Sequence, residues 1–164
     1  MRTLGVILFL VALIASAMPS SAAEPLPNSG AAKLAAYAVC HSLAVVDMGA
    51  FGSQSSAECT GIVRTRDGAK LLDNLAIRCL EEARARPEEY KFFGTCVQTD
   101  DDGDKLFMTY GGPESGPFEW IGGTGKYKDV VGSGTWSVAD APGNTSNLFA
   151  FTLSYDATWT KKEK

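Results

Sequence analysis

Residues 148–160 read LFAFTLSYDATWT. Every second residue from 149 to 159 is apolar, and the residues between them are mostly small and polar. Side chains alternate between the two faces of a β-strand, so this period of two places one set against a core and the other toward solvent or a wet interior. The stretch therefore predicts a long β-strand with one buried face.

Shorter segments upstream carry the same signal. The strands expected from them cover residues 57–64, 71–80, 91–99, 105–110 and 118–121. Turn signals lie at 66–68 and 100–104, and the charged residues 81–90, with Pro87, are expected to form a solvated loop or a helical turn. Residues 111–116 are expected to form another loop. Short strands separated by Gly and Asp turns indicate an antiparallel all-β domain, and seven or eight of them can close into a barrel.

The chain begins with one cation, Arg2, and an uncharged, mostly apolar run from Leu4 to Ala15, followed by Pro19 and small residues. This layout predicts a cleaved secretory signal peptide over residues 1–23. A membrane anchor is the alternative, but the run is shorter than the ~20 residues that a bilayer core requires. The mature protein is therefore expected to be exported, either periplasmic or secreted, with no membrane span.

The rest of the chain is expected to form one domain between two short ends. Residues 24–33 are predicted to be a linker, residues 34–160 the β-barrel domain and residues 161–164 a charged tail. The alanine-rich residues 31–38 favour a short helical or irregular lead, and an alternating pattern favours a strand from Val39 onward.

The cysteines are Cys40, Cys59, Cys79 and Cys96. They contain no Cys-x-x-Cys pair, which a zinc site or a thioredoxin-like motif would normally show. Export implies an oxidising environment, so structural disulfides are the favoured interpretation. Spacing alone leaves three pairings open, and we favour Cys40–Cys59 with Cys79–Cys96 because each would join consecutive strands.

Composition limits the classes of function. The chain has 164 residues, 15 Lys and Arg against 19 Asp and Glu, and a net charge of -4 with its single histidine neutral. Such a chain is not a strongly basic nucleic-acid binder, and a hydrophobic content of 45% is typical of a folded domain. No motif indicates a cofactor.

The glycine-rich segment 122–127 resembles a phosphate-binding loop only superficially. A Walker loop requires a glycine where Trp120 stands and Ser or Thr where Tyr127 stands, and the dinucleotide pattern requires a glycine at Lys128. A tight structural turn is the favoured interpretation because glycine adopts positive φ readily. Its residues are Gly122, Gly123 and Gly125.

The acidic run 100–104 is expected to form a hairpin turn through Asp102 and Gly103. An EF-hand loop beginning at Asp100 would need glycine where Lys105 stands. A weak surface calcium site is the alternative, and we predict no metal.

No catalytic constellation is evident. His41 is the only histidine, and its neighbour Cys40 is expected to be oxidised, so a structural or partly exposed histidine is favoured over a triad member. A carboxylate in the lumen could act as a general acid or base. The carboxylates on or beside expected strands are Glu58, Glu119, Asp140 and Asp156. The aromatic residues expected in the core are Trp120, Trp136, Tyr155 and Trp159. Residues 144–146 form a glycosylation sequon.

Residues 118–127, FEWIGGTGKY, continuing to GSGTW at 132–136, resemble the signature of the allene oxide cyclase-like barrels, which the plant dirigent proteins share. Residues 94–107 resemble a hairpin of exported bacterial members without assigned function. One departure is Asp129, because a glycine commonly follows the aromatic–basic pair. The resemblance implies a calycin-like, eight-stranded antiparallel barrel with an apolar cavity, and no catalytic or ligand-binding residue of those families can be matched to this chain.

Three functional interpretations follow. The first is an exported, non-enzymatic barrel that either binds a small hydrophobic ligand or is packed solid and acts through its surface. The second is an isomerase or cyclase that uses a carboxylate or tyrosine in the cavity, and the third is an envelope-associated interaction protein whose segment 31–48 docks a partner. The size of the lumen separates these interpretations, because ligand pockets rarely measure less than about 300 Å³. A lumen under about 100 Å³ would exclude both ligand binding and catalysis inside the barrel.

Overall fold

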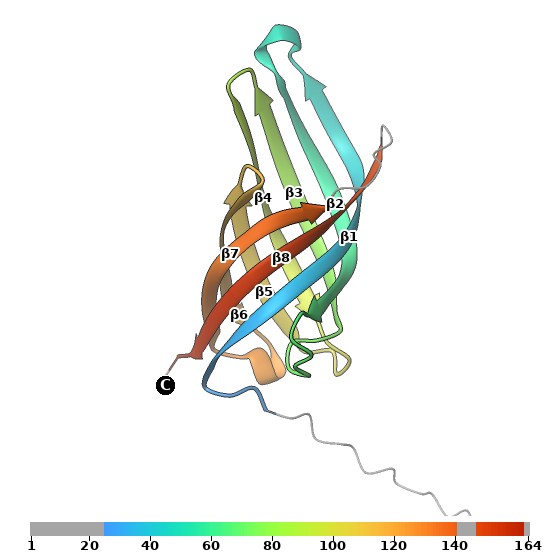
Figure 1. The fold of residues 1–164 in the computed structure, drawn as a ribbon. Helices are drawn as coiled ribbons and strands as arrows, with labels where there is room; N and C mark the ends of the chain where they lie inside the picture. The colour runs from blue at the N-terminus through green and yellow to red at the C-terminus, as the bar shows by residue number, and fades with distance from the viewer. Residues whose placement is uncertain (1–24, 141–146, 163–164) are drawn as a thin grey trace, which may run out of the picture.

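The chain forms a closed barrel of eight antiparallel strands in a computed structural model that describes residues 25–140 and 147–162 (Figure 1). Each strand pairs with its neighbours in the sequence, and the last strand closes the barrel against the first. The strands are β1 (Ser29–Asp47), β2 (Ser53–Thr65), β3 (Leu75–Arg86), β4 (Glu89–Thr99), β5 (Lys105–Gly112), β6 (Ser115–Gly123), β7 (Val130–Asp140) and β8 (Leu148–Lys161). Two single turns of 3-10 helix, η1 (Gly49–Phe51) and η2 (Gly125–Tyr127), lie between strands. The all-β, eight-stranded barrel expected from the sequence is confirmed.

Strand β8 shows how the alternating pattern of the sequence builds the wall of the barrel. Tyr155, Ala157 and Trp159 are buried, whereas Asp156 and Thr158 between them are exposed. Buried residues from all eight strands supply one contiguous core inside the barrel. Its largest fully buried side chains include Trp120, Tyr127, Tyr155 and Phe118. Trp136 and Trp159 are also buried, so the four aromatic residues assigned to the core lie there.

Strand β1 corrects the prediction for the N-terminal segment. It begins at Ser29, inside the expected linker 24–33, and the helical lead expected over 31–38 is wrong. Ala32, Leu34 and Ala36 are buried and Lys33 is exposed, which is the period of a strand. Alanine favours helix in isolation, but pairing with both β2 and β8 overrides that preference.

The charged segment 81–90 is also strand rather than loop or helix. Strand β3 runs on to Arg86, and β4 begins at Glu89, which leaves a two-residue turn that contains Pro87. Most of the loop expected at 111–116 is likewise strand, with its turn at 113–114. In both places the charged or glycine-rich composition resembled a loop, whereas ladder pairing with the neighbouring strands determines the conformation.

Two disulfides lie side by side on the inner wall. Cys40 is bonded to Cys59 and Cys79 to Cys96, with a Cα–Cα distance of 4.0 Å in each pair. The four residues face one another in successive strands, since Cys59 also lies opposite Cys79 in the register of β2 and β3. These are the pairs favoured from chain order, and all four side chains are buried.

The turns identified in the sequence meet at one end of the barrel. Gly103, Gly122 and Gly125 have φ values of 82°, 142° and 51°, a region that favours glycine. Gly123 is in close contact with the Lys105 carbonyl, because a β-carbon at residue 123 would lie 2.3 Å from that oxygen.

An ion-pair cluster links the acidic turn at residues 100–104 to the glycine-rich turn at residues 122–127. The ammonium of Lys126 lies 2.8 Å from a carboxylate oxygen of Asp100 and 2.8 Å from one of Asp102. The acidic run is thus a turn that carries a lysine between its carboxylates.

Some predictions lie outside the described residues: the signal peptide over 1–23, the sequon at 144–146 and the last two residues of the expected tail. The first residue of that tail, Lys161, ends β8. Among the helices of the described residues, none has the length and hydropathy to cross a membrane.

Candidate functional site

The barrel opens into a cup at the end opposite the glycine turns. The hairpins β1–β2 and β3–β4 extend beyond the other strands at the top of Figure 1. A cavity of about 640 Å³ lies within this end. Its lining is Ser42, Ser55, Ser56, Ala57, Glu81, Ala83, Tyr90, Phe92, Glu114, Val138, Phe149, Phe151 and Leu153.

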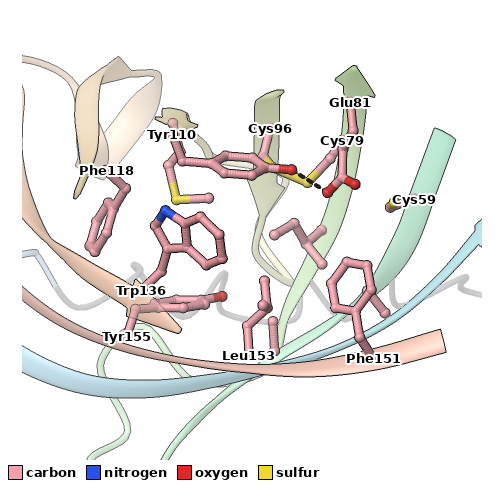
Figure 2. A pocket seen from close by; sticks show the side chains of 14 residues that line it. Cys59, Cys79, Glu81, Cys96, Tyr110, Phe118, Trp136, Phe151, Leu153 and Tyr155 are labelled. Atoms are coloured by element: carbon pink, nitrogen blue, oxygen red, sulfur yellow. Dashed lines mark hydrogen bonds between the residues drawn. A yellow bond between two sulfur atoms is a disulfide. The ribbon is translucent and has the colours of Figure 1, made fainter. Parts of the chain in front are cut away.

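Below the cup the barrel is almost solid. A residual pocket of about 20 Å³ is lined by Trp136, Phe118 and Tyr155 among others (Figure 2). Edge-to-face aromatic contacts fill this section; the ring centroids of Phe118 and Tyr155 are 5.7 Å apart and those of Tyr110 and Trp136 are 5.6 Å apart. The lumen is therefore divided, and of the two cavities described inside it the cup is the one with the volume of a ligand pocket.

Glu81 lies at the boundary between the cup and the packed core, where it lines both cavities. It is opposite Gly94 in the β3–β4 register, and Gly94 is opposite Tyr110 in the β4–β5 register. Because Gly94 has no side chain, the Tyr110 ring lies over it, and a β-carbon at residue 94 would be 2.6 Å from the Tyr110 hydroxyl oxygen. The Tyr110 hydroxyl reaches across and donates a hydrogen bond to Oε1 of Glu81 (Figure 2).

Burial determines the electrostatics of this pair. Glu81 and Tyr110 are each 8% exposed. Burial raises the pKa of Glu81, although the hydrogen bond from Tyr110 acts in the opposite direction by favouring the ionised carboxylate. Burial and the neighbouring Glu81 raise the pKa of Tyr110. Glu81 therefore keeps its proton to a higher pH than an exposed carboxyl group does.

Two other tyrosines lie near the Glu81–Tyr110 pair. The hydroxyl of Tyr155, below Glu81, is buried and meets no hydrogen-bond partner among the described residues. Tyr90, at the rim, packs edge-to-face on Phe92 with centroids 5.9 Å apart, and burial together with Glu81 and Glu114 raises its pKa.

The carboxylates singled out in the sequence do not form this site. Glu58 pairs with Arg78 at 2.5 Å, Asp156 pairs with Arg66, and Glu119 is exposed. The side chain of Asp140 lies outside the described residues. His41 is exposed.

Sequence reasoning missed Glu81 because its segment, EEARARPEE, has the composition of a solvated loop. A signal was nevertheless present. Leu75, Ile77 and Cys79 share one face of the strand, and continuing that period by two residues places Glu81 on the same inward face.

A metal ion is not favoured beside Glu81. The sulfur atoms of Cys40 and Cys59 lie within 4.8 Å of a Glu81 carboxylate oxygen. The two sulfurs are bonded to each other, so neither offers a thiolate ligand.

Comparison with known proteins identifies the fold. No protein-family model matches the sequence, and no curated protein matches it. Seven chains of solved structures do match. Among them are the pterocarpan synthase dirigent protein GePTS1, with a TM-score of 0.50 and 13% identity over 86% of this chain and 91% of that one, and the pterocarpan synthase dirigent protein PsPTS1, with a TM-score of 0.51 and 12% identity over 85% of this chain and 100% of that one. The chain therefore shares the closed, eight-stranded antiparallel barrel fold of these dirigent proteins.

Proposed function

We propose that this protein works outside the cytoplasm and binds a small, largely apolar molecule in the cup. The two disulfides and the signal-like residues 1–23 support the location, because disulfides persist in oxidising compartments. The cup supports the binding role.

One observation carries the proposal: a cavity of about 640 Å³ has a mainly apolar wall and a single deeply buried carboxyl group at its base. Phe149, Phe151 and Leu153 of β8 line this cavity together with Tyr90 and Phe92 of β4, a strand on the opposite side of the closed barrel. Concave, mostly apolar pockets of 300–1,000 Å³ with few polar groups are typical of small-molecule sites.

Binding of an apolar fluorescent dye, Nile red, tests the proposal. The emission of the dye should shift to the blue on titration with the wild-type protein. The variant Ala83→Trp should lose most of this binding, because residue 83 lines the cup and the indole would fill it. Leu80→Trp is the matched control, since residue 80 is on the same strand but 59% exposed. Absence of dye binding to the wild type, or equal binding by the Ala83→Trp variant, would refute the proposal.

An isomerase or cyclase is the second candidate, and the Glu81–Tyr110 pair is the observation that favours it. A buried carboxyl group with a raised pKa at the base of an apolar cavity can act as a general acid toward a bound molecule. The two structural neighbours are named as synthases, which agrees with chemistry in this kind of barrel. Conversion of a bound compound that the Glu81→Gln variant binds but does not convert would establish this candidate over simple binding.

A further inference from the structure

We infer that the cup selects an uncharged molecule that carries a hydrogen-bond acceptor, such as a ketone or ether oxygen, and that the carboxyl group of Glu81 donates the hydrogen bond to it. This inference rests on the proposed binding function and specifies the ligand class. It follows from the charges that face the cup and from the position of Glu81.

The charged groups in the cup are all acidic. Among the lining residues that the structure describes, Glu81 and Glu114 carry carboxyl groups, and none is a lysine, arginine or histidine. A carboxylate ligand that entered the cup would lose its hydration without gaining a cation as a partner, and it would be repelled by two acidic side chains. The cup therefore disfavours fatty-acid-like and other anionic molecules.

Depth distinguishes the two glutamates. Glu114 is exposed at the rim, in the turn between β5 and β6, whereas Glu81 is 8% exposed. Around the base of the cup Glu81 is accompanied by Ala57, Phe151 and Leu153, which offer no polar side-chain atom. An ammonium ligand would need Glu81 ionised in these apolar surroundings, at a large desolvation cost to both charges.

The hydrogen bond from Tyr110 determines how Glu81 can serve a ligand. Tyr110 donates to Oε1, and Figure 2 shows the second carboxyl oxygen turned away from that hydroxyl. When the group is protonated, Oε1 is the acceptor for Tyr110 and the proton resides on Oε2, which becomes a donor. Burial raises the pKa of Glu81 and so favours this protonated form.

The remaining hydroxyl groups do not provide an equivalent contact. Ser42, Ser55 and Ser56 are half-buried and lie on the open hairpin walls, and Tyr90 is 50% exposed at the rim, so water competes for all four hydroxyl groups. The Tyr110 hydroxyl is already used as a donor to Glu81. Glu81 is therefore the deepest group that can recognise a ligand oxygen among the described lining residues.

Four naphthalene compounds with the same ring system test the inference: 2-acetylnaphthalene, 2-ethylnaphthalene, 2-naphthoate and 2-naphthylmethylamine. Their affinities are measured by displacement of Nile red from about pH 5 to about pH 7, where a free carboxylic acid such as 2-naphthoic acid is mostly ionised. We expect the ketone to bind about 3- to 10-fold more tightly than the ethyl compound, from the net value of one hydrogen bond. We expect the carboxylate and the amine to bind at least about tenfold more weakly than the ketone, because a buried charge without a partner is costly.

Variants of Glu81 and Glu114 show whether the preference for the ketone depends on Glu81. Glu81→Gln keeps a donor and should retain the preference for the ketone over the ethyl compound, and the rim control Glu114→Gln should also retain it. Glu81→Leu should abolish it, and the double variant Glu81→Leu/Tyr110→Phe, which removes both polar partners, gives the same test if the single variant folds poorly.

The outcomes separate this inference from the proposed function. If Nile red and all four compounds fail to bind, both are overturned. If the ketone and the ethyl compound bind equally, or the amine or carboxylate binds most tightly, the cup binds ligands but the inference is wrong. Retention of the ketone preference in the folded Glu81→Leu or double variant would also overturn it.

Discussion

Removing one hydroxyl group from each of two buried tyrosines should change the stability of this barrel in opposite directions. Tyr110 and Tyr155 both face the lumen and are 8% and 2% exposed. The hydroxyl of Tyr110 donates to Glu81, whereas the hydroxyl of Tyr155 has no hydrogen-bond partner among the described residues. The variants Tyr110→Phe and Tyr155→Phe make the same chemical change, and the two hydroxyl groups differ in their hydrogen bonding.

The expected magnitudes follow from these contacts. Tyr110→Phe leaves a buried carboxyl group without its donor, which should lower the free energy of unfolding by about 2 kcal/mol. Tyr155→Phe removes a buried hydroxyl without a partner, which should raise the free energy of unfolding by about 1 kcal/mol. For a domain of this size about 1 kcal/mol corresponds to roughly 3–4 °C, so the Tm should fall by about 7 °C in the first variant and rise by about 3 °C in the second.

Urea denaturation followed by tryptophan fluorescence, with thermal melts by circular dichroism, measures both changes. The hydrogen bond from Tyr110 favours the ionised form of Glu81, so the loss in Tyr110→Phe should also grow as pH rises and Glu81 ionises. A loss below about 0.5 kcal/mol in Tyr110→Phe would contradict the role of the Glu81–Tyr110 hydrogen bond. Equal destabilisation by both variants would show that the Tyr155 hydroxyl contributes a favourable interaction, which contradicts its assignment as unpaired.

Three further predictions concern the same wall of the barrel. Because the pKa of Glu81 is raised in the folded protein, the folded state holds a proton that the unfolded chain releases near the ordinary value of 4.5, so stability should fall as pH rises from there through the folded pKa. Glu81→Gln should remove this decline, and urea titrations across pH should show the variant gaining relative to wild type; a constant difference would contradict the raised pKa. The double variant Cys79→Ala/Cys96→Ala opens a crosslink between residues 17 apart and should lose about 3 kcal/mol in urea denaturation under non-reducing conditions, and no loss would show that the crosslink contributes nothing. Gly94→Ala places a β-carbon 2.6 Å from the Tyr110 hydroxyl oxygen and should cost about 1–3 kcal/mol, whereas an unchanged Tm would mean that the ring moves freely.

The sequence pattern predicted the barrel well where burial follows composition. In residues 148–160 the apolar residues are also the inward residues, so one pattern shows both the strand and its face. Prediction failed where the residue types of a segment suggest a helix or a loop although its alternate side chains face the lumen of the barrel. The inward positions of β1 are mostly alanine, which suggests helix, and the inward face of β3 continues into the glutamate-rich run at residue 81, which suggests a loop.

The candidate site could not be assembled from the sequence, although each of its parts was visible there. Glu81, Gly94 and Tyr110 are adjacent only through the registers of three strands. The register depends on how whole strands pair and on where the hairpin turns fall, and a shift of one residue would turn Glu81 to the outer surface.

By itself, the sequence predicted an antiparallel β domain that can close into a barrel, located its glycine turns along the chain, and favoured, among three possible pairings, the pairs Cys40–Cys59 and Cys79–Cys96 that the structure contains. These depend on local periodicity, turn chemistry and neighbouring strands, which are properties of short segments. Only the tertiary structure decided that aromatic side chains fill the lower lumen, that the longer hairpins leave a cup above it, and that Glu81 is buried at its base. Cavity volume and desolvation depend on side chains from all the strands of the wall at once, so no single segment of the chain encodes them.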